Sequence, residues 1–454
     1  MSVGSIPART GHLSKIEPGR APDNHVNAPP ASVWPPKLNR RRGRLMLGDY
    51  IEFVRQNRRF AAFGFLIALG SSFGQTFFIG IFGPSIQQEF GLSHTAWGSV
   101  YLAGTLASAL VLPFSGRLID RLPLVPFTLS VCLLLALACG SIAAAPSVLF
   151  LVFSIFLLRQ GGQGLMSHVA LTTMARYFTA TRGRAIALAT MGMALGEAIL
   201  PFSAVGLIAI WGWRPTYAGA GLALILIWVP LAWWLLSPMR ATGTAQAAAP
   251  GEPARARTPV RSWTRREVIR DLRFYLILPA IVAPSLIVTA MFFHHLNLAD
   301  AKGWSHTWVT GNYVMYAMGS VATSLIAGRL IDRYSAKAMV PVLLLPLVVA
   351  MALMAMAENA WVVIVYFILL GINTGISQTS VPALWAELYG VDHIGGIRSL
   401  AASMSVFASA LGPVIAGALM DSGLAIETVC WIFGAGALLG SLAVRAGLRK
   451  RGAP

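Results

Sequence analysis

Two charged side chains, Arg159 and Glu197, lie in the middle of long apolar stretches of the sequence. A charge at the centre of a bilayer is costly unless it is paired or faces water, so both residues are candidates for function. The planar guanidinium of an arginine matches a carboxylate through two parallel hydrogen bonds. A carboxyl group that is removed from water is suited to taking up a proton. These two residues therefore predict the binding of an anion and the exchange of a proton.

The two charges occur in neighbouring predicted helices, so a single ion pair between Arg159 and Glu197 would satisfy both. In a functional interpretation, Arg159 anchors the anion, and Glu197 takes up a proton near neutral pH and releases the arginine for substrate. In a structural interpretation, the same pair is static and orients two helices. The residues alone leave both interpretations open.

Further polar residues accompany the two charges. Gln163 lies one turn after Arg159, Gln160 is adjacent, and His168 lies deeper toward the cytoplasm, so this face of the helix is expected to line a cavity. The other candidates for substrate contact or coupling are polar residues of other predicted helices: Gln75, His294, Tyr313, Asn373 and Gln378. Intramembrane amides and hydroxyls also bridge helices, which is the alternative role for this group.

The elements that position these residues are predicted to be membrane-spanning helices. Of the 454 residues, 56% are hydrophobic and only 11% are charged, whereas soluble domains carry about 25% charged residues. Apolar runs of the length needed to cross a bilayer occur near residues 60–83, 95–116, 123–145, 147–170, 185–209, 215–237, 273–297, 307–329, 338–357, 360–382, 396–419 and 424–446. The runs are continuously apolar without alternation, which indicates helices and not barrel strands.

The distribution of basic residues predicts the orientation. The chain has 35 Lys and Arg against 17 Asp and Glu; 32 of the 35 fall in the two termini and one set of loops. Two, Arg214 and Lys302, fall on the opposite side, and Arg159 lies within a span. This asymmetry places both termini in the cytoplasm and requires an even number of spans. The net charge of +18 is thus attributed to orientation beside an anionic inner leaflet and not to nucleic-acid binding.

An internal repeat divides the chain into two halves. Residues 91–121 align without gaps on residues 303–333, with 12 of 31 positions identical. Both copies contain Ser-His-Thr at the start and Gly-Arg-Leu-Ile-Asp-Arg at the end, and both run from outside to inside. We therefore expect two parallel six-helix repeats, an architecture of secondary transporters that bind substrate at the interface between repeats. Ser93 and Ser305 are predicted to be helix N-caps.

The motifs Gly116–Arg121 and Gly328–Arg333 resemble the loop signature of the major facilitator superfamily, and the resemblance covers roughly residues 58–447. The segment from Arg176 to Ala185 is similar to the one before helix five in the monocarboxylate and oxalate/formate branch. The helix-one stretch from Phe63 to Gly80 lacks the acidic residue of that branch, a departure that bears on proton coupling.

The resemblance implies a cytoplasmic gate in which helix-end charges pair in one state and separate in the other. The gating residues it indicates are Asp120, Arg121, Asp332, Arg333 and Arg184. The alternative is that these loops are tight turns that carry positive anchors for the inner face.

The predicted organisation has five parts: a disordered basic tail at 1–58, which contains a second possible start at Met46, helical halves at 59–237 and 273–447, a basic central loop at 238–272 and a short tail at 448–454. The three cysteines lie inside apolar runs, so we expect neither disulfides nor a metal site, and no cofactor. No nucleotide-binding or nucleophile motif indicates an enzyme.

The sequence thus favours an all-α, twelve-helix secondary transporter, monomeric and located in the plasma membrane of a bacterium. Its expected substrate is a small organic anion, monocarboxylate-like, moved together with a proton. The alternative is a carrier, including an exporter, of a neutral or amphipathic compound such as an aromatic nutrient, vitamin or drug, in which Arg159 and Glu197 are structural. A membrane-embedded sensor or enzyme is the least supported class.

Overall fold

The computed structural model describes Met1 and residues 54–178, 182–242, 262–390 and 393–449. Most of the predicted basic tail with Met46, the middle of the central loop and residues 450–454 lie outside the described residues. The description below concerns the unit Tyr50–Pro454. All regular structure in its described residues is helical.

The N-terminal half begins with an interrupted helix. The predicted span 60–83 is formed by successive pieces: α2 (Arg58–Gly70), the short 3₁₀ turn η1 (Ser71–Gly74), α3 (Thr76–Ile81) and α4 (Gly83–Phe90). The break lies at Gln75, which has extended backbone angles of φ −86° and ψ 156°. Gly and Ser are weak helix formers, and a cluster of them precedes this break. The interruption explains why eleven helices of the described chain, and not twelve, are each long and apolar enough to cross a membrane.

The remaining helices of this half follow the predicted spans. They are α5 (His94–Ser115), α6 (Leu118–Arg121), α7 (Leu124–Ala143), α8 (Val148–Leu158), η2 (Arg159–Met166), α9 (Ser167–Tyr177), α10 (Arg182–Trp211), α11 (Trp213–Ala223), η3 (Leu224–Trp228) and α12 (Val229–Thr242). Segments η2 and η3 are π-helical turns that continue the helices around them. The side chain of Ser93 accepts a hydrogen bond from the backbone of Ala96, so this predicted N-cap is confirmed.

The C-terminal half repeats the arrangement. It comprises α13 (Arg265–Arg270), α14 (Leu272–Ile277), α15 (Pro279–Ala301), α16 (His306–Gly311), α17 (Tyr313–Tyr334), α18 (Ala336–Met339), η4 (Val340–Val342), α19 (Leu345–Met356), α20 (Val362–Tyr389), α21 (Ile394–Asp421) and α22 (Ile426–Arg449). Ser305 caps α16 as predicted. In the described part of the predicted central loop 238–272, α12 extends to Thr242 and α13 forms a short helix.

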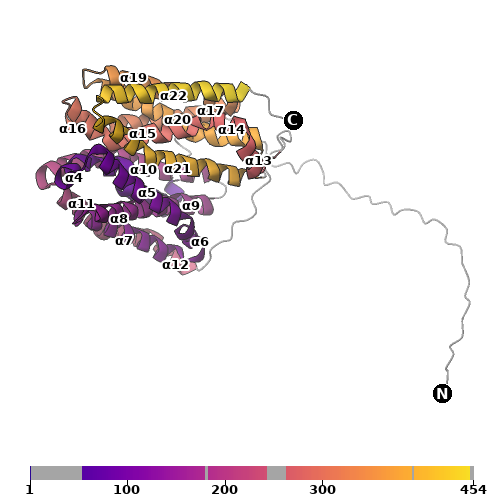
Figure 1. Ribbon diagram of the computed structural model, residues 1–454. Coiled ribbons are helices and arrows are strands. Elements are labelled where there is room, and N and C mark those ends of the chain that lie inside the picture. The colour runs from indigo at the N-terminus through magenta and orange to yellow at the C-terminus, as the bar shows by residue number, and fades with distance from the viewer. Residues whose placement is uncertain (2–53, 179–181, 243–261, 391–392, 450–454) are drawn as a thin grey trace, which may run out of the picture. The chain divides into compact units, whose positions relative to one another are not determined.

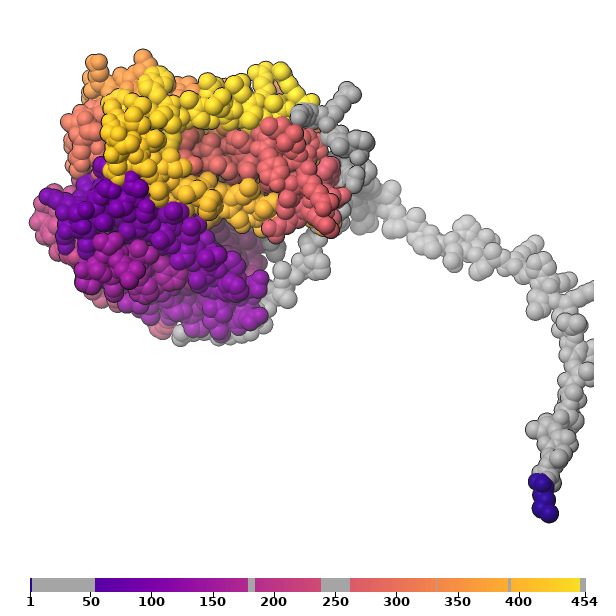
Figure 2. All heavy atoms as spheres, viewed as in Figure 1, coloured from indigo at the N-terminus to yellow at the C-terminus, as the bar shows by residue number. Residues whose placement is uncertain are grey.

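The two halves meet along paired helices. In Figures 1 and 2 the indigo α5 of the N-terminal half lies against the yellow α21 of the C-terminal half. Glycines permit this approach near the outer end: a Cβ on Gly98 would lie 2.8 Å from the backbone oxygen of Pro413, and one on Gly417 would lie 2.6 Å from the backbone of His94. Close backbone packing between small residues is the usual means of helix association in membranes.

Each half has an ion pair at its outer end, which connects two of its helices. Arg214 contacts Glu89 at 2.6 Å and donates to the backbone oxygens of Ala143 and Ala145. Lys302 contacts Glu427 at 2.8 Å and donates to the backbone oxygen of Ala357. Hydrogen bonding from Arg214 holds the pKa of the Glu89 carboxyl below its usual range. The two outer basic residues noted in the sequence are therefore both neutralised by an acid.

A crossing of two glycines joins the interrupted first helix to η2. A Cβ on Gly162 would lie 2.6 Å from Cα of Gly74, and a Cβ on Gly74 would lie 2.1 Å from the backbone oxygen of Leu158. The obstructing atoms are all backbone, so they cannot move aside as a flexible side chain would. This crossing brings the broken part of helix one next to Arg159.

We expect the Gly162→Val variant to be destabilised, because overpacking of a close contact costs about 1–3 kcal/mol. Thermal unfolding of the purified protein, followed by tryptophan fluorescence, measures the effect. Gly140→Val is the matched control, since a Cβ at Gly140 meets nothing within 4 Å. Equal melting temperatures for the two variants would show that the crossing is not tightly packed.

Candidate substrate cavity

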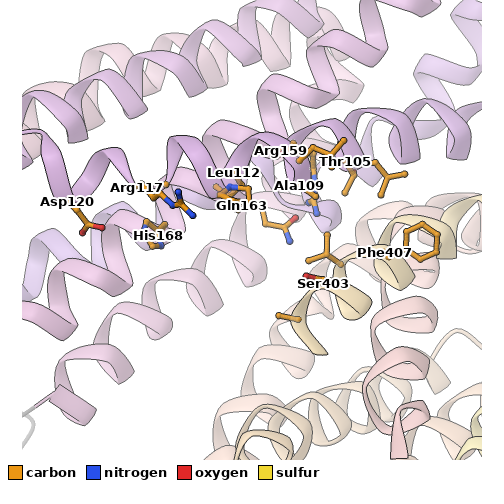
Figure 3. Close-up of a pocket in the computed structure, with 18 residues that line it drawn as sticks. Thr105, Ala109, Leu112, Arg117, Asp120, Arg159, Gln163, His168, Ser403 and Phe407 are labelled. Carbon is orange, nitrogen blue, oxygen red and sulfur yellow. The ribbon is translucent and has the colours of Figure 1, made fainter. Parts of the chain in front are cut away.

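A cavity of about 810 Å³ extends from the middle of the N-terminal half to its inner end. It lies between α5 and η2 on one side and α21 on the other. Figure 3 shows Arg159 and Thr105 toward one end, Asp120, Arg117 and His168 toward the other, and Ser403 and Phe407 on the facing α21. The motif that ends α5 carries the inner-loop charges, so the cavity opens toward the cytoplasm.

The inner end of the cavity is formed by the first of the two repeated loops. The lining residues are Thr105, Leu106, Ser108, Ala109, Leu110, Leu112, Pro113, Gly116, Arg117, Asp120, Arg159, Gln163, Gly164, His168, Ala402, Ser403, Val406 and Phe407. Ten of them are apolar or glycine, and eight are polar or charged. An apolar wall that also carries polar groups is typical of sites for small organic molecules.

Arg159 lies at the deep end of this cavity and is only 3% exposed. It begins the π-helical segment η2, whose sequence Arg-Gln-Gly-Gly-Gln-Gly is poor in helix-stabilising residues. Such π turns often occur at functional sites. Its guanidinium donates to the backbone oxygen of Gly74 at 3.4 Å and to Oγ1 of Thr76 at 3.2 Å. The break in helix one thus leaves a carbonyl free to accept from Arg159.

Tyr101 completes the surroundings of Arg159. The guanidinium carbon lies 5.2 Å from the centroid of the Tyr101 ring, a cation–π contact. The Tyr101 hydroxyl is 2.5 Å from Oγ1 of Thr76. Among the described residues, no carboxylate forms an ion pair with Arg159. The buried cation is held by neutral groups alone.

The predicted pair of Arg159 and Glu197 is therefore not formed in this structure. Glu197 is half-buried on α10, which packs against α17 of the C-terminal half. The physical reason is the rotation of the helices: α10 presents this face to the C-terminal half, while η2 turns Arg159 toward helix one and α5. Two helices that are consecutive in the sequence need not turn their charged side chains toward each other.

The other N-terminal candidates separate into two groups. Gln163 and His168 line the cavity with Arg159. Gln160 instead bridges helices, since its Nε2 donates to Ser115 at 2.6 Å and its Oε1 accepts from Ser108 at 3.0 Å. Gln160 is thus used in packing and does not line the cavity. Gln75 is half-buried at the break of helix one.

The structure places the C-terminal candidates away from this cavity. His294 hydrogen-bonds the backbone oxygen of Pro413 at 3.0 Å, and Tyr313 bonds the buried His295 at 3.0 Å. Asn373 donates to the backbone oxygen of Leu343, and Gln378 is exposed on α20. His294, Tyr313 and Asn373 bridge helices, the alternative role expected for intramembrane polar groups.

The structure describes the side chains of four of the five residues predicted for the inner gate. Asp120 pairs with Arg176 of α9, within the same half, and not with Arg121 as expected. Arg121 and Arg184 are exposed, and Arg333 lies over the ring of Tyr334. The side chain of Asp332 lies outside the described residues. The partner differs because α9 runs beside the loop and supplies Arg176 from a direction that the linear motif does not show.

The outer ends of the halves are closed by polar contacts. The carboxylate of Asp421, the last residue of α21, accepts from the backbone N–H of His94 at 3.1 Å and of Thr95 at 2.8 Å. It thereby caps the N-terminus of α5 from the opposite half. Asn297 extends the closure by contacting the rings of both His94 and His294.

An aromatic layer lies beneath these polar contacts. Phe293 of α15 stacks on Trp97 at 5.3 Å between ring centroids and contacts Tyr101 at 4.7 Å. Phe292 contacts Phe77 across the halves at 6.5 Å. The layer separates Arg159 from the outer face, so the cavity is closed outside and open inside.

Sequence reasoning missed several of these residues. Thr105 and Phe407 line the cavity, and Asp421 seals its outer side. Thr105 and Phe407 are ordinary residues in apolar helices and gave no signal. Asp421 was visible as an acid at a span end, and the glycine-rich run after Arg159 was a sign of irregular backbone in the middle of a span.

The two parallel halves, the interrupted helix and the buried cation in a cavity match the architecture that is typical of secondary transporters. The chain belongs to the Major Facilitator Superfamily, whose sequence profile matches residues 64–322 and 296–453. The predicted superfamily membership and helical fold are confirmed.

Two curated relatives are transporters or resistance proteins. The chain is 32% identical over 184 residues to a gallate transporter of Pseudomonas putida, a match that covers 38% of each chain. It is 29% identical over 252 residues to a chloramphenicol resistance protein of Streptomyces lividans, covering 55% of this chain and 60% of that protein. The matches thus span less than two thirds of the length of these relatives.

Solved structures show the same fold at low identity. The nucleoside transporter NupG superposes with a TM-score of 0.65 and 13% identity, covering 87% of this chain and 99% of that one. A bacterial homolog of the human lysosomal transporter Spinster, in an inward-facing and unoccupied conformation, gives a TM-score of 0.59 at 14% identity over 88% of this chain and 93% of that one.

We expect Asp421→Ala to shift the protein away from the inward-open arrangement, because loss of a helix cap costs about 1 kcal/mol, or roughly a fivefold change in an equilibrium. Ala402→Cys, in the cavity wall, reports the change through a lower rate of maleimide labelling. The native cysteines are buried and give little background. Asp300→Ala is the control, since Asp300 pairs with His306 within one half. Equal labelling rates in both variants would contradict the role of Asp421.

Proposed function

We propose that this protein moves a small organic anion across the membrane by alternating access, with Arg159 as the anion anchor. The observation that carries the proposal is a guanidinium that is 3% exposed, lines a cavity and has no ion pair with any described carboxylate. A buried charge without a partner is unfavourable. A substrate carboxylate supplies the missing negative charge.

The closed outer side and the open inner side support alternating access. In this arrangement Arg159 is reached from the cytoplasm, and the contact of Asp421 with α5 holds the outer side shut. Transport requires a second arrangement in which the outer contacts separate and the inner loops approach. Asp120, Arg121, Asp332, Arg333 and Arg184 are the proposed charges of the inner gate in that second arrangement.

The gallate transporter among the relatives supports an organic anion as substrate. A second candidate is a neutral, amphipathic compound, which the chloramphenicol resistance protein and the apolar residues of the cavity wall favour. Leu106, Val406 and Phe407 would contact such a compound. The anion is preferred because an apolar ligand leaves the charge of Arg159 uncompensated.

We also propose that transport of the anion is coupled to movement of a proton, with Glu197 as the coupling residue. Glu197 is half-buried on α10, which packs against α17 of the opposite half. A carboxyl group at a surface that opens and closes changes its exposure to water during the cycle, and its proton affinity changes with it.

We further propose that the protein lies in the plasma membrane, the inner membrane of a bacterium.

Arg159→Lys should weaken the binding of small carboxylates, gallate included, about tenfold or more, because the lysine lacks the bidentate geometry. Competition in reconstituted proteoliposomes measures the effect. Arg445→Lys, an exposed position at the inner end of α22, is the matched control. Unchanged carboxylate binding, with chloramphenicol competing equally well in both variants, would favour the neutral carrier.

Glu197→Gln should allow substrate exchange but remove the dependence of net uptake on the proton gradient, because the amide cannot take up a proton. Uptake across a range of external pH measures this. Glu358→Gln, at an exposed residue between α19 and α20, is expected to keep the pH profile of the unmodified protein. A retained profile in Glu197→Gln would exclude Glu197 as the coupling residue.

A further inference from the structure

Two oxygens on the cavity wall, Oγ1 of Thr105 and Oε1 of Gln163, are buried without a hydrogen bond. Arg159 has hydrogen bonds to neutral groups but no ion pair with a described carboxylate. Buried side-chain oxygens without partners are uncommon in folded proteins, and each one needs a reason. These three groups belong to one cavity (Figure 3).

The neighbouring polar groups are already paired. Ser108 and Gln160 bond each other, and Thr76 bonds both Tyr101 and Arg159. Eleven buried side-chain atoms of the described residues have no hydrogen bond, and the two that line this cavity are one hydroxyl and one amide oxygen, beside the charge of Arg159. A ligand that satisfies all three carries a carboxylate and a separate hydrogen-bond donor.

The spacing of these groups limits the form of the ligand. Arg159 and Gln163 lie on the same π-helical segment, η2, and both line the cavity. Thr105 faces them from α5, and Phe407 lies on the opposite wall. A donor held several ångströms from the carboxylate by a flat apolar body fits this arrangement, with the ring packed on the wall near Phe407.

We propose that the substrate is a hydroxylated aromatic carboxylate, with its carboxylate on Arg159 and its ring hydroxyl between Oε1 of Gln163 and Oγ1 of Thr105. This inference rests on the proposed function and adds the substrate class. The ring hydroxyl donates to the amide oxygen of Gln163 and accepts from the hydroxyl of Thr105. Gln163 and Thr105 are thus specificity-determining residues, and Arg159 provides the charge.

The test compares two acids that differ by one hydroxyl. The dissociation constants of benzoate and 4-hydroxybenzoate are measured with the purified full chain by ligand-dependent thermal stabilisation. We expect 4-hydroxybenzoate to bind about tenfold more tightly to the unmodified protein, because a site built for a hydroxyl rejects the analogue that lacks it. In Gln163→Leu and in the nearly isosteric Thr105→Val, the ratio should fall to about twofold or less, with benzoate binding retained.

The control variant is Ser399→Ala, an exposed polar residue of α21 outside the cavity wall whose loss should leave the ratio unchanged. Equal binding of the two acids to the unmodified protein, with both lost in Arg159→Lys, would overturn the substrate class and leave the proposed function intact. Binding of neither acid would overturn both. A tenfold preference that survives in both Gln163→Leu and Thr105→Val would also overturn the assignment.

Discussion

The structure depends on one constraint: the guanidinium of Arg159 must be kept inside an apolar helix bundle without an ion pair to any carboxylate of the described residues. The irregular helical segments around Arg159 provide the acceptors and the space that this guanidinium needs. Helix one breaks at Gln75 and offers the carbonyl of Gly74, while η2 widens into a π turn at Arg159. The glycine crossing at Gly162 allows the two irregular segments to touch. Each departure from regular helix supplies an acceptor or the room for one.

The same neutral acceptors connect the cavity to the outer closure. Thr76 and Tyr101 hold Arg159, and the ring of Tyr101 contacts Phe293 of the opposite half. An anion that takes hydrogen bonds from Arg159 competes with Thr76 for the same donors. Occupation of the cavity and the packing of the outer aromatic layer therefore share residues, which is the physical requirement for a ligand to favour one arrangement of the halves over another.

Properties set by local composition could be predicted from the sequence. The lengths of the apolar runs, the position of the basic residues and the repeated motif indicated the helices, their orientation and the two halves, and Ser93 and Ser305 were recognised as caps from their own neighbours. Arg159 was identified because any charge in such a run stands out.

Side-chain partners could not be predicted in the same way, because they depend on the rotation of each helix. The π turn in η2 alters the phase of the residues that follow, so that Gln163 faces the cavity while Gln160 bonds α5. Glu197 and Arg159 occur in consecutive spans but face different neighbours. Asp120 lies beside Arg121 in the chain, yet its partner, Arg176, comes from another helix. Thr105 stands out only because its buried hydroxyl has no hydrogen bond, and the sequence alone cannot show this.

The ion pair at the outer rim occurs in both halves of the chain. In the first copy the acid, Glu89, precedes the basic residue, Arg214; in the second the basic residue, Lys302, precedes the acid, Glu427. In both copies the cation also binds a carbonyl at the end of the third helix of its half. The chain order of the two charges is thus reversed between the copies, while each pair remains electrically neutral.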